Sequence, residues 1–210
     1  MSNENIISKV PEKLKDAAKK VRHLAESFIS MCKPLEQASL HLLADGCTGA
    51  IFCECHIRAS TLVTHGTVDV PLDPDEQPEY RANRELAEDH VAYERMKADA
   101  ISGRAFSNLV VEFRMLKDDE PSLMVIGGQH RFHAIQSAHE KGVDEYHGIK
   151  VYFGLDTDQR LDVQLISNTN IAVSTDLLDR MYETWSGPEL RNWCQQVGLL
   201  FEGQDFADKR

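Results

Sequence analysis

The sequence predicts an α+β fold in which a small mixed sheet is flanked by helices. Strand-like segments rich in β-branched and aromatic residues occur at 108–115, 123–126 and 148–154. Helical patterns lie before, between and after these strands, at about 85–101, 132–141 and 159–168. Short strands that alternate with helices in this order favour one sheet with helices packed against it.

The composition is that of an ordinary globular protein. The chain has 210 residues, 42% hydrophobic and 27% charged, which fits one domain with an extension or two small domains. The net charge of −11 disfavours non-specific wrapping of DNA, which needs clustered lysines and arginines. The sequence has no apolar run long enough for a membrane span and no signal peptide, and its five cysteines suggest reduced thiols. We therefore expect a cytoplasmic protein that does not enter membranes.

Residues 1–58 are predicted to form a helical extension. Apolar residues recur at helical spacing between Pro11, which suits the start of a helix, and Pro34, which lies just past its end. A second helix is predicted from Leu35 to Ala44, closing at Asp45-Gly46. We expect the two helices to form a hairpin that packs on the main domain or makes a homodimer contact.

A cluster of potential zinc ligands lies within ten residues, at Cys47, Cys53, Cys55 and His56. Thiolate and imidazole are usual zinc ligands, but this spacing lacks the paired Cys-x2-Cys of structural sites. Cys53 and Cys55 also alternate with Phe52, as residues do along a strand, here predicted from Ala50 to Ile57. Small buried residues explain that pattern equally well, so we predict that no metal is bound.

Two further elements are predicted on either side of the central strands. The segment from Thr61 to Val70 alternates like a strand, and an acidic, proline-rich loop follows at 71–79. Farther along, Asp156 or Thr157 is expected to cap the helix Gln159–Asn168. The apolar positions that this helix is expected to direct inward are Leu161, Val163 and Leu165.

The stretch most suggestive of a binding site is a glycine turn between the 123–126 strand and the next helix. Gly127 and Gly128 are followed there by Gln129, His130 and Arg131. A helix N-terminus presents free N–H groups and the positive end of a dipole, and glycine lets a phosphate approach the backbone. Arg131 adds a fork of donors for phosphate oxygens, and His130 adds a titratable donor. The alternative is a structural turn that needs glycine for its φ angles.

The run Gly-Gly-Gln-His-Arg, followed by an alanine-bearing helix, resembles the signature of the ParB/sulfiredoxin superfamily. It is most similar to the branch named for Asp-Gly-Gln-His-Arg, which includes DndB-like proteins of DNA-modification systems. Gly127 stands where that branch has aspartate, and Gln129 where sulfiredoxin has its reactive cysteine. The resemblance covers about residues 80–170 and implies a ParB/sulfiredoxin-like nucleotide-binding core, which we place at 59–172. C-terminal helices at 173–210 would follow it and suit continuation in a longer chain.

The resemblance also implies roles for individual residues. The residues over which nucleotide phosphates would lie are Gly127, Gly128, Gln129, His130 and Arg131. Arg81 and Arg84 would contact the nucleotide from a second side, unless they are surface charges at a helix start. Asn168 matches the asparagine of the Glu-Asn-x-Gln-Arg box of ParB, whereas Ser167 replaces its acidic residue.

These features lead to three hypotheses of function. The first is a DndB-like protein that binds ATP or CTP, with or without Mg²⁺, and hydrolyses the nucleotide or switches on it. It would act in DNA modification, defence or their regulation, with DNA or DNA-modification proteins as partners, and His130, Arg131 and Asn168 would carry the chemistry. The second is a DNA-binding transcriptional regulator without turnover, which the missing carboxylate at Ser167 would suit. The third is a protein-interaction module in which the glycine turn is structural. We adopt the first hypothesis.

Overall fold

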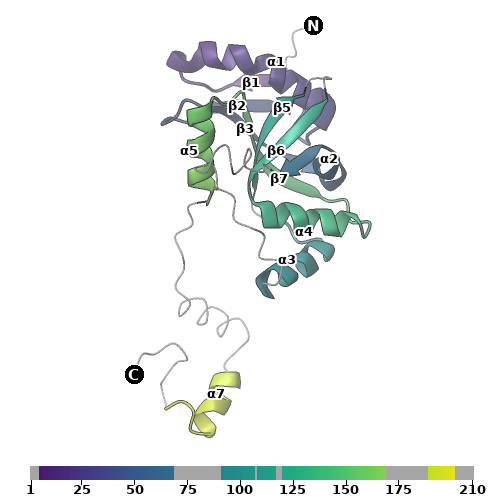
Figure 1. Ribbon diagram of the computed structural model, residues 1–210, viewed down its shortest axis with the longest axis vertical. Helices are drawn as coiled ribbons and strands as arrows, with labels where there is room; N and C mark the ends of the chain where they lie inside the picture. Colours follow the sequence, from purple (N-terminus) through teal and green to yellow (C-terminus); the bar gives the residue numbers. More distant parts are fainter. Residues whose placement is uncertain (1–4, 69–90, 107, 117–119, 169–188, 202–210) are drawn as a thin grey trace, which may run out of the picture. The chain divides into compact units, whose positions relative to one another are not determined.

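The computed structural model describes residues 5–68, 91–106, 108–116, 120–168 and 189–201. These residues belong to two compact units, 1–169 and 170–210. The first unit is built on one seven-stranded mixed sheet with helices packed on both faces (Figure 1), which confirms the predicted α+β class. Within the described ranges, no helix is both long enough and apolar enough to cross a membrane.

The seven strands lie in the order β1-β2-β3-β7-β5-β6-β4. They are Ile6–Ser8 (β1), Leu40–Ala44 (β2), Ile51–Arg58 (β3), Gly66–Val68 (β4), Leu109–Met115 (β5), Pro121–Gly127 (β6) and Tyr146–Phe153 (β7). Strand β3 pairs with β7 along its whole length, from Ile51 opposite Phe153 to Arg58 opposite Tyr146. Strand β5 lies between β7, to which it is parallel, and β6, to which it is antiparallel, and β6 leads into the glycine turn.

The helices bury both faces of this sheet. Helices α1 (Lys15–Cys32), α2 (Ala59–His65) and α4 (Gln129–His139) pack on one face, and α5 (Thr157–Asn168) packs on the other (Figure 1). On the first face, the Phe28 ring of α1 meets Phe113 and Phe153 edge-on, with centroids 5.5 and 5.9 Å apart. On the second face, Val163 of α5 packs in the same cluster as Ile126. Helix α3 (Val91–Ile101) packs on α4 through small residues.

The N-terminal segment differs most from the sequence prediction. The long amphipathic helix is confirmed as α1, preceded by the short 3-10 helix η1 (Glu12–Leu14). The second helix, predicted from Leu35 to Ala44, is wrong, because residues 35–39 form turns and Leu40–Ala44 is β2. Leu40 and Leu42 are buried while His41 is exposed, an alternation typical of a strand. The described residues 5–58 therefore form no helical hairpin, and their three strands belong to the same sheet as β5, β6 and β7.

The predicted strand from Thr61 to Val70 is also corrected. Residues 59–65 form α2, and Gly66–Val68 form β4 at the edge of the sheet, while residues 69 and 70 of the predicted strand lie outside the described ranges. The start of α2 is stabilised by Asp144, whose carboxylate accepts hydrogen bonds from Ser60 N (2.8 Å) and Ser60 Oγ (3.2 Å). This helix cap comes from a residue 84 positions away, so the local sequence pattern contains no sign of it.

The elements predicted in the second half of the chain are confirmed within a few residues as β5, β6, α4, β7 and α5. Asp156 caps α5 as predicted: its Oδ1 accepts from Gln159 N at 2.8 Å, and its own N–H donates to Gln159 Oε1 at 3.2 Å. Val163 is buried as predicted, but Leu165 is 62% exposed, so the prediction that it points inward is wrong.

Other predicted helices are described only in part. Helix α3 accounts for the end of the predicted 85–101 helix, and residues 85–90 lie outside the described ranges. In the second unit, α7 (Glu189–Gln196) falls within the C-terminal helices predicted at 173–210.

Candidate functional site

The glycine turn predicted from the sequence lies between β6 and α4. Strand β6 ends at Gly127, and Gly128 caps α4 with φ of 89°, a left-handed conformation that favours glycine. The helix begins at Gln129, three residues earlier than predicted. Gln129, His130 and Arg131 therefore form its first turn, where backbone N–H groups have no partner within the helix.

Arg131 folds back over the turn. Its Nη1 donates a hydrogen bond to the backbone oxygen of Asn108 at 2.9 Å. A Cβ added at Gly128 would lie 3.0 Å from Arg131 Nη2 and 2.8 Å from Leu109 Cδ2. Glycine is thus needed at position 128 both for its φ angle and for the close approach of these side chains. Burial lowers the pKa of Arg131 below its ordinary value, because the charged guanidinium is partly removed from water.

His130 is oriented by α3. Its ring lies edge-on to Tyr93, with the centroids 5.6 Å apart and the planes at 75°. Lys97 Nζ lies 4.4 Å from the centroid of the Tyr93 ring. Helix α3 thus forms a side wall beside the first turn of α4, with the Tyr93 ring next to His130 and Lys97 next to Tyr93. No prediction from the sequence included Tyr93 or Lys97.

The end of α5 returns to the same turn. A Cβ added at Gly127 would lie 2.8 Å from Ser167 Cβ, 3.3 Å from Ser167 Oγ and 3.3 Å from Val110 Cβ. Ser167 therefore packs directly on Gly127, and Asn168 follows it as the last residue of α5. The C-terminal end of a helix carries partial negative charge, so the α5 end and the α4 start have complementary dipoles.

A buried ion cluster fastens α5 to the sheet. Glu112 of β5 is 2% exposed, and its carboxylate accepts hydrogen bonds from Arg114 Nη2 at 2.6 Å and Arg160 Nε at 3.0 Å. Arg160 Nη2 also donates to Leu155 O at 3.2 Å. Because two guanidinium groups already neutralise it, Glu112 does not serve as a metal ligand. Its position within the apolar run Leu-Val-Val-Glu-Phe was the one sequence signal for a buried charge.

Two predicted site residues, Arg81 and Arg84, lie outside the described residues. Within the described ranges, no group of three or more His, Cys, Asp or Glu side chains is arranged to hold a metal ion. Ser167 brings a hydroxyl group to the turn, whereas magnesium prefers carboxylates and phosphate oxygens. The described residues therefore do not fit a magnesium site supplied by the protein alone, and we derive no step that depends on one.

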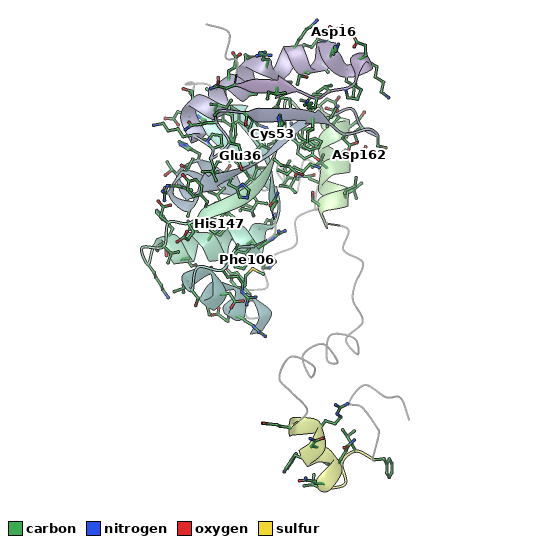
Figure 2. The ribbon with its side chains drawn as sticks, turned by 180° about the vertical axis from the view of Figure 1, so that it is seen from behind. Asp16, Glu36, Cys53, Phe106, His147 and Asp162 are labelled. Carbon is green, nitrogen blue, oxygen red and sulfur yellow. The ribbon has the colours of Figure 1, made fainter. Side chains whose placement is uncertain are left out.

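The residues of the cysteine cluster lie apart, in the core, in a turn and on the exposed face of β3. Cys53 and Cys55 are buried in the core, as the strand alternation predicted, and Cys53 is seen inside the first unit in Figure 2. Cys47 is exposed in a turn, and His56 is exposed with its Nδ1 2.6 Å from Glu36 Oε1. Burial, and to a lesser extent the neighbouring Cys55, raises the pKa of Cys32 to about 12. The Cys32 thiol is consequently protonated and unreactive at neutral pH.

Comparisons with family models, with curated proteins and with solved structures found no match to this chain.

Proposed function

We propose that this protein binds a nucleoside triphosphate, ATP or CTP, with the phosphates at the start of α4. The observation that carries the proposal is the position of Arg131, a partly desolvated cation over Gly128 at a helix N-terminus. An anion at this point would gain from the helix dipole, from backbone N–H groups and from the charge of Arg131. It would also offset part of the cost of burying the guanidinium.

The arrangement of elements supports a core of the ParB/sulfiredoxin kind. The order α3, β5, β6, α4, β7, α5 is the order that the resemblance implies for residues 80–170. The contact between Ser167 and Gly127 agrees with the expected return of the Ser167–Asn168 segment to the phosphate turn. We therefore propose a DndB-like role for the chain, in DNA modification, in defence or in their regulation.

Each residue of the turn has a distinct role in this proposal. Arg131 and the first N–H groups of α4 hold phosphate oxygens, and His130, oriented by Tyr93, donates a further hydrogen bond. The resemblance assigns Asn168, the last residue of α5, a part in the chemistry. Ser167 has no carboxylate with which to hold a cation that would offset the charge on the phosphates, so hydrolysis is expected to be slow.

Calorimetric titration with ATP, CTP and GTP tests the proposal directly. Arg131→Ala should weaken binding by about 1.5–3 kcal/mol, the range for a hydrogen bond to a charged group. Arg22→Ala is the matched control, because Arg22 lies on α1 and forms an ion pair with Glu26 at 3.3 Å. Thermal unfolding of both variants separates a loss of binding from a loss of folding. Wild-type affinity in the Arg131→Ala variant would contradict the phosphate role.

A second candidate function is a DNA-binding regulator without turnover. It is favoured by Ser167 in place of a carboxylate and by the lack of a metal-holding group in the part of the chain that the structure describes. Duplex binding measured at several salt concentrations, with and without nucleotide, distinguishes the two functions. Nucleotide-independent duplex binding without phosphate release would favour the regulator.

A further inference from the structure

Asn108 lies beside the glycine turn, in a position that no sequence pattern predicted. It directly precedes β5 and is exposed, and its backbone oxygen accepts the hydrogen bond from Arg131 Nη1 at 2.9 Å. The parallel pairing of Leu109 with Ile149 places Asn108 next to Gly148 of β7. Asn108 thus contacts both the guanidinium of Arg131 and strand β7.

The Asn108 amide approaches β7 closely because position 148 is glycine. A Cβ added at Gly148 would overlap Asn108 Oδ1 and would lie 3.0 Å from Asn108 Cγ. Gly148 has an ordinary φ angle, so this close approach is the feature that requires a residue without a side chain. An exposed amide has one acceptor and two donors, and here its placement is restricted by the strand beneath it.

Asn108 lies on the face of the sheet that α5 covers farther along β7. Along β7, Ile149 and Val151 are buried in the core with α1, whereas Tyr152 packs in the cluster with Val163 of α5. Gly148 shares the orientation of Tyr152 by the alternation of the strand. Asn108 and Ser167 therefore lie on the same side of the sheet, one next to Arg131 and the other on Gly127.

We propose that Asn108 is a specificity-determining residue that hydrogen-bonds the nucleoside part of the nucleotide, its base or ribose. The inference rests on the proposed function, since it takes the phosphates to lie at Arg131. An exposed amide adjacent to the phosphate anchor and fixed against Gly148 presents a neutral donor and acceptor pair. Such a pair suits the uncharged, polar edge of a base or sugar better than it suits a phosphate.

The test compares ATP and CTP with inorganic tripolyphosphate, which has the phosphates but no nucleoside. Asn108→Ala keeps the backbone oxygen that anchors Arg131 and removes the amide. It should weaken ATP or CTP binding by about fivefold or more, the value of one lost hydrogen bond, and leave tripolyphosphate binding unchanged. Gly148→Ala keeps the amide but displaces it from β7, and it should cause the same selective loss.

The possible outcomes separate this inference from the proposed function. Equal weakening of nucleotide and tripolyphosphate in Asn108→Ala would show that Asn108 acts only through Arg131, and unchanged nucleotide binding would show that it makes no contact. Either result overturns the inference and leaves the phosphate site standing. A wild-type protein that binds neither nucleotide nor tripolyphosphate overturns both. Thermal unfolding of each variant excludes misfolding as the cause of a loss.

Discussion

Helices α2 and α4 both follow a strand and pack on the same face of the sheet, yet their first turns are built differently. At α2, the carboxylate of Asp144 accepts hydrogen bonds from Ser60 N at 2.8 Å and Ser60 Oγ at 3.2 Å. Burial alone would raise the pKa of Asp144, but hydrogen bonds from Ser60 and the charge of Arg58 outweigh it and hold the pKa below its ordinary value. The chain thus places its own anion at the start of α2.

At α4, the capping position is Gly128, which has no side chain, and the nearby charge is the guanidinium of Arg131. An internal carboxylate satisfies a helix start and closes it to external anions, whereas glycine and arginine leave the helix dipole available to a ligand. The difference between the two helix starts is therefore the difference between a structural cap and a candidate binding site.

The largest effect is expected at Glu112, because its ion pairs hold α5 to the sheet and so keep the end of α5 beside the start of α4. Glu112→Gln leaves Arg114 and Arg160 without their shared anion and should lower the free energy of unfolding by about 3 kcal/mol. This is the lower end of the range for a broken buried pair, since both arginines keep some contact with solvent. Urea denaturation measures the change, with Glu54→Gln on the exposed surface of β3 as control. A loss below about 1 kcal/mol would show that the buried cluster does not hold α5.

A smaller effect should separate the two reasons for glycine at position 128. Gly128→Ala combines a φ of 89° with a Cβ only 2.8 Å from Leu109 Cδ2, and should cost about 2 kcal/mol. Gly142→Ala is the control, because Gly142 has a similar φ of 87° and no atom within 4 Å of the added Cβ. It should cost about 1 kcal/mol of unfolding free energy. Equal costs at the two positions would mean that packing over Gly128 contributes nothing.

At the start of α2, Asp144→Asn keeps a capping side chain but removes its charge. The variant should be less stable than wild type by up to about 1 kcal/mol at pH 7. Because the folded pKa of Asp144 is lowered, its contribution is complete above the unfolded pKa of about 3.9 and is lost as the pH falls through the folded value. Urea denaturation at pH 7 and pH 3 should therefore show a difference at the higher pH that shrinks at the lower one. Asp162→Asn, on the exposed side of α5 (Figure 2), is the control.

The sequence predicted those parts of the fold whose signals are local. Asp156 and Gln159 are three residues apart and form the expected cap of α5. Gly127 and Gly128 end an apolar run and begin a helix, which predicted the turn between β6 and α4. In both cases the interacting groups are neighbours in the chain, so a pattern of a few residues contains the whole cause.

The remaining features depend on contacts between distant residues. Asp144, which caps the start of α2, lies 84 positions from Ser60, and Arg160 lies 48 positions from Glu112. The helix predicted at Leu40 and Leu42 is wrong because two buried leucines at i and i+2 indicate a strand only weakly. The neighbouring strand that confirms it is not visible in the local sequence. The contact of Asn108 with Gly148 requires the pairing of β5 with β7, which sequence reasoning did not establish. The fold class could thus be predicted, but the position of Asn108 beside the candidate site could not.

The smallest effect on stability is expected when a residue of α5 brings a carboxylate to the start of α4, and this change should still affect binding. Ser167 packs on Gly127, so Ser167→Glu would bring to α4 the kind of internal anion that Asp144 supplies to α2. The dipole of α4 favours a carboxylate at the start of that helix, whereas the dipole of α5 disfavours one at its C-terminal end. The two effects oppose each other, so the free energy of unfolding should change by less than about 0.5 kcal/mol. The added charge should repel phosphates and weaken ATP binding without magnesium by roughly three- to tenfold at low salt.

Leu165→Glu is the matched control for this charge. Leu165 is 62% exposed on the same helix, so the variant adds an identical carboxylate on a solvent-facing side of α5 rather than at the turn. Its effect on affinity should be smaller than that of Ser167→Glu, and raising the salt concentration should reduce both because solvent ions screen exposed charges. Calorimetry on the two variants at low and high salt measures this. If both carboxylates weaken binding equally, the repulsion is a property of the whole surface, and the start of α4 has no special relation to the phosphates.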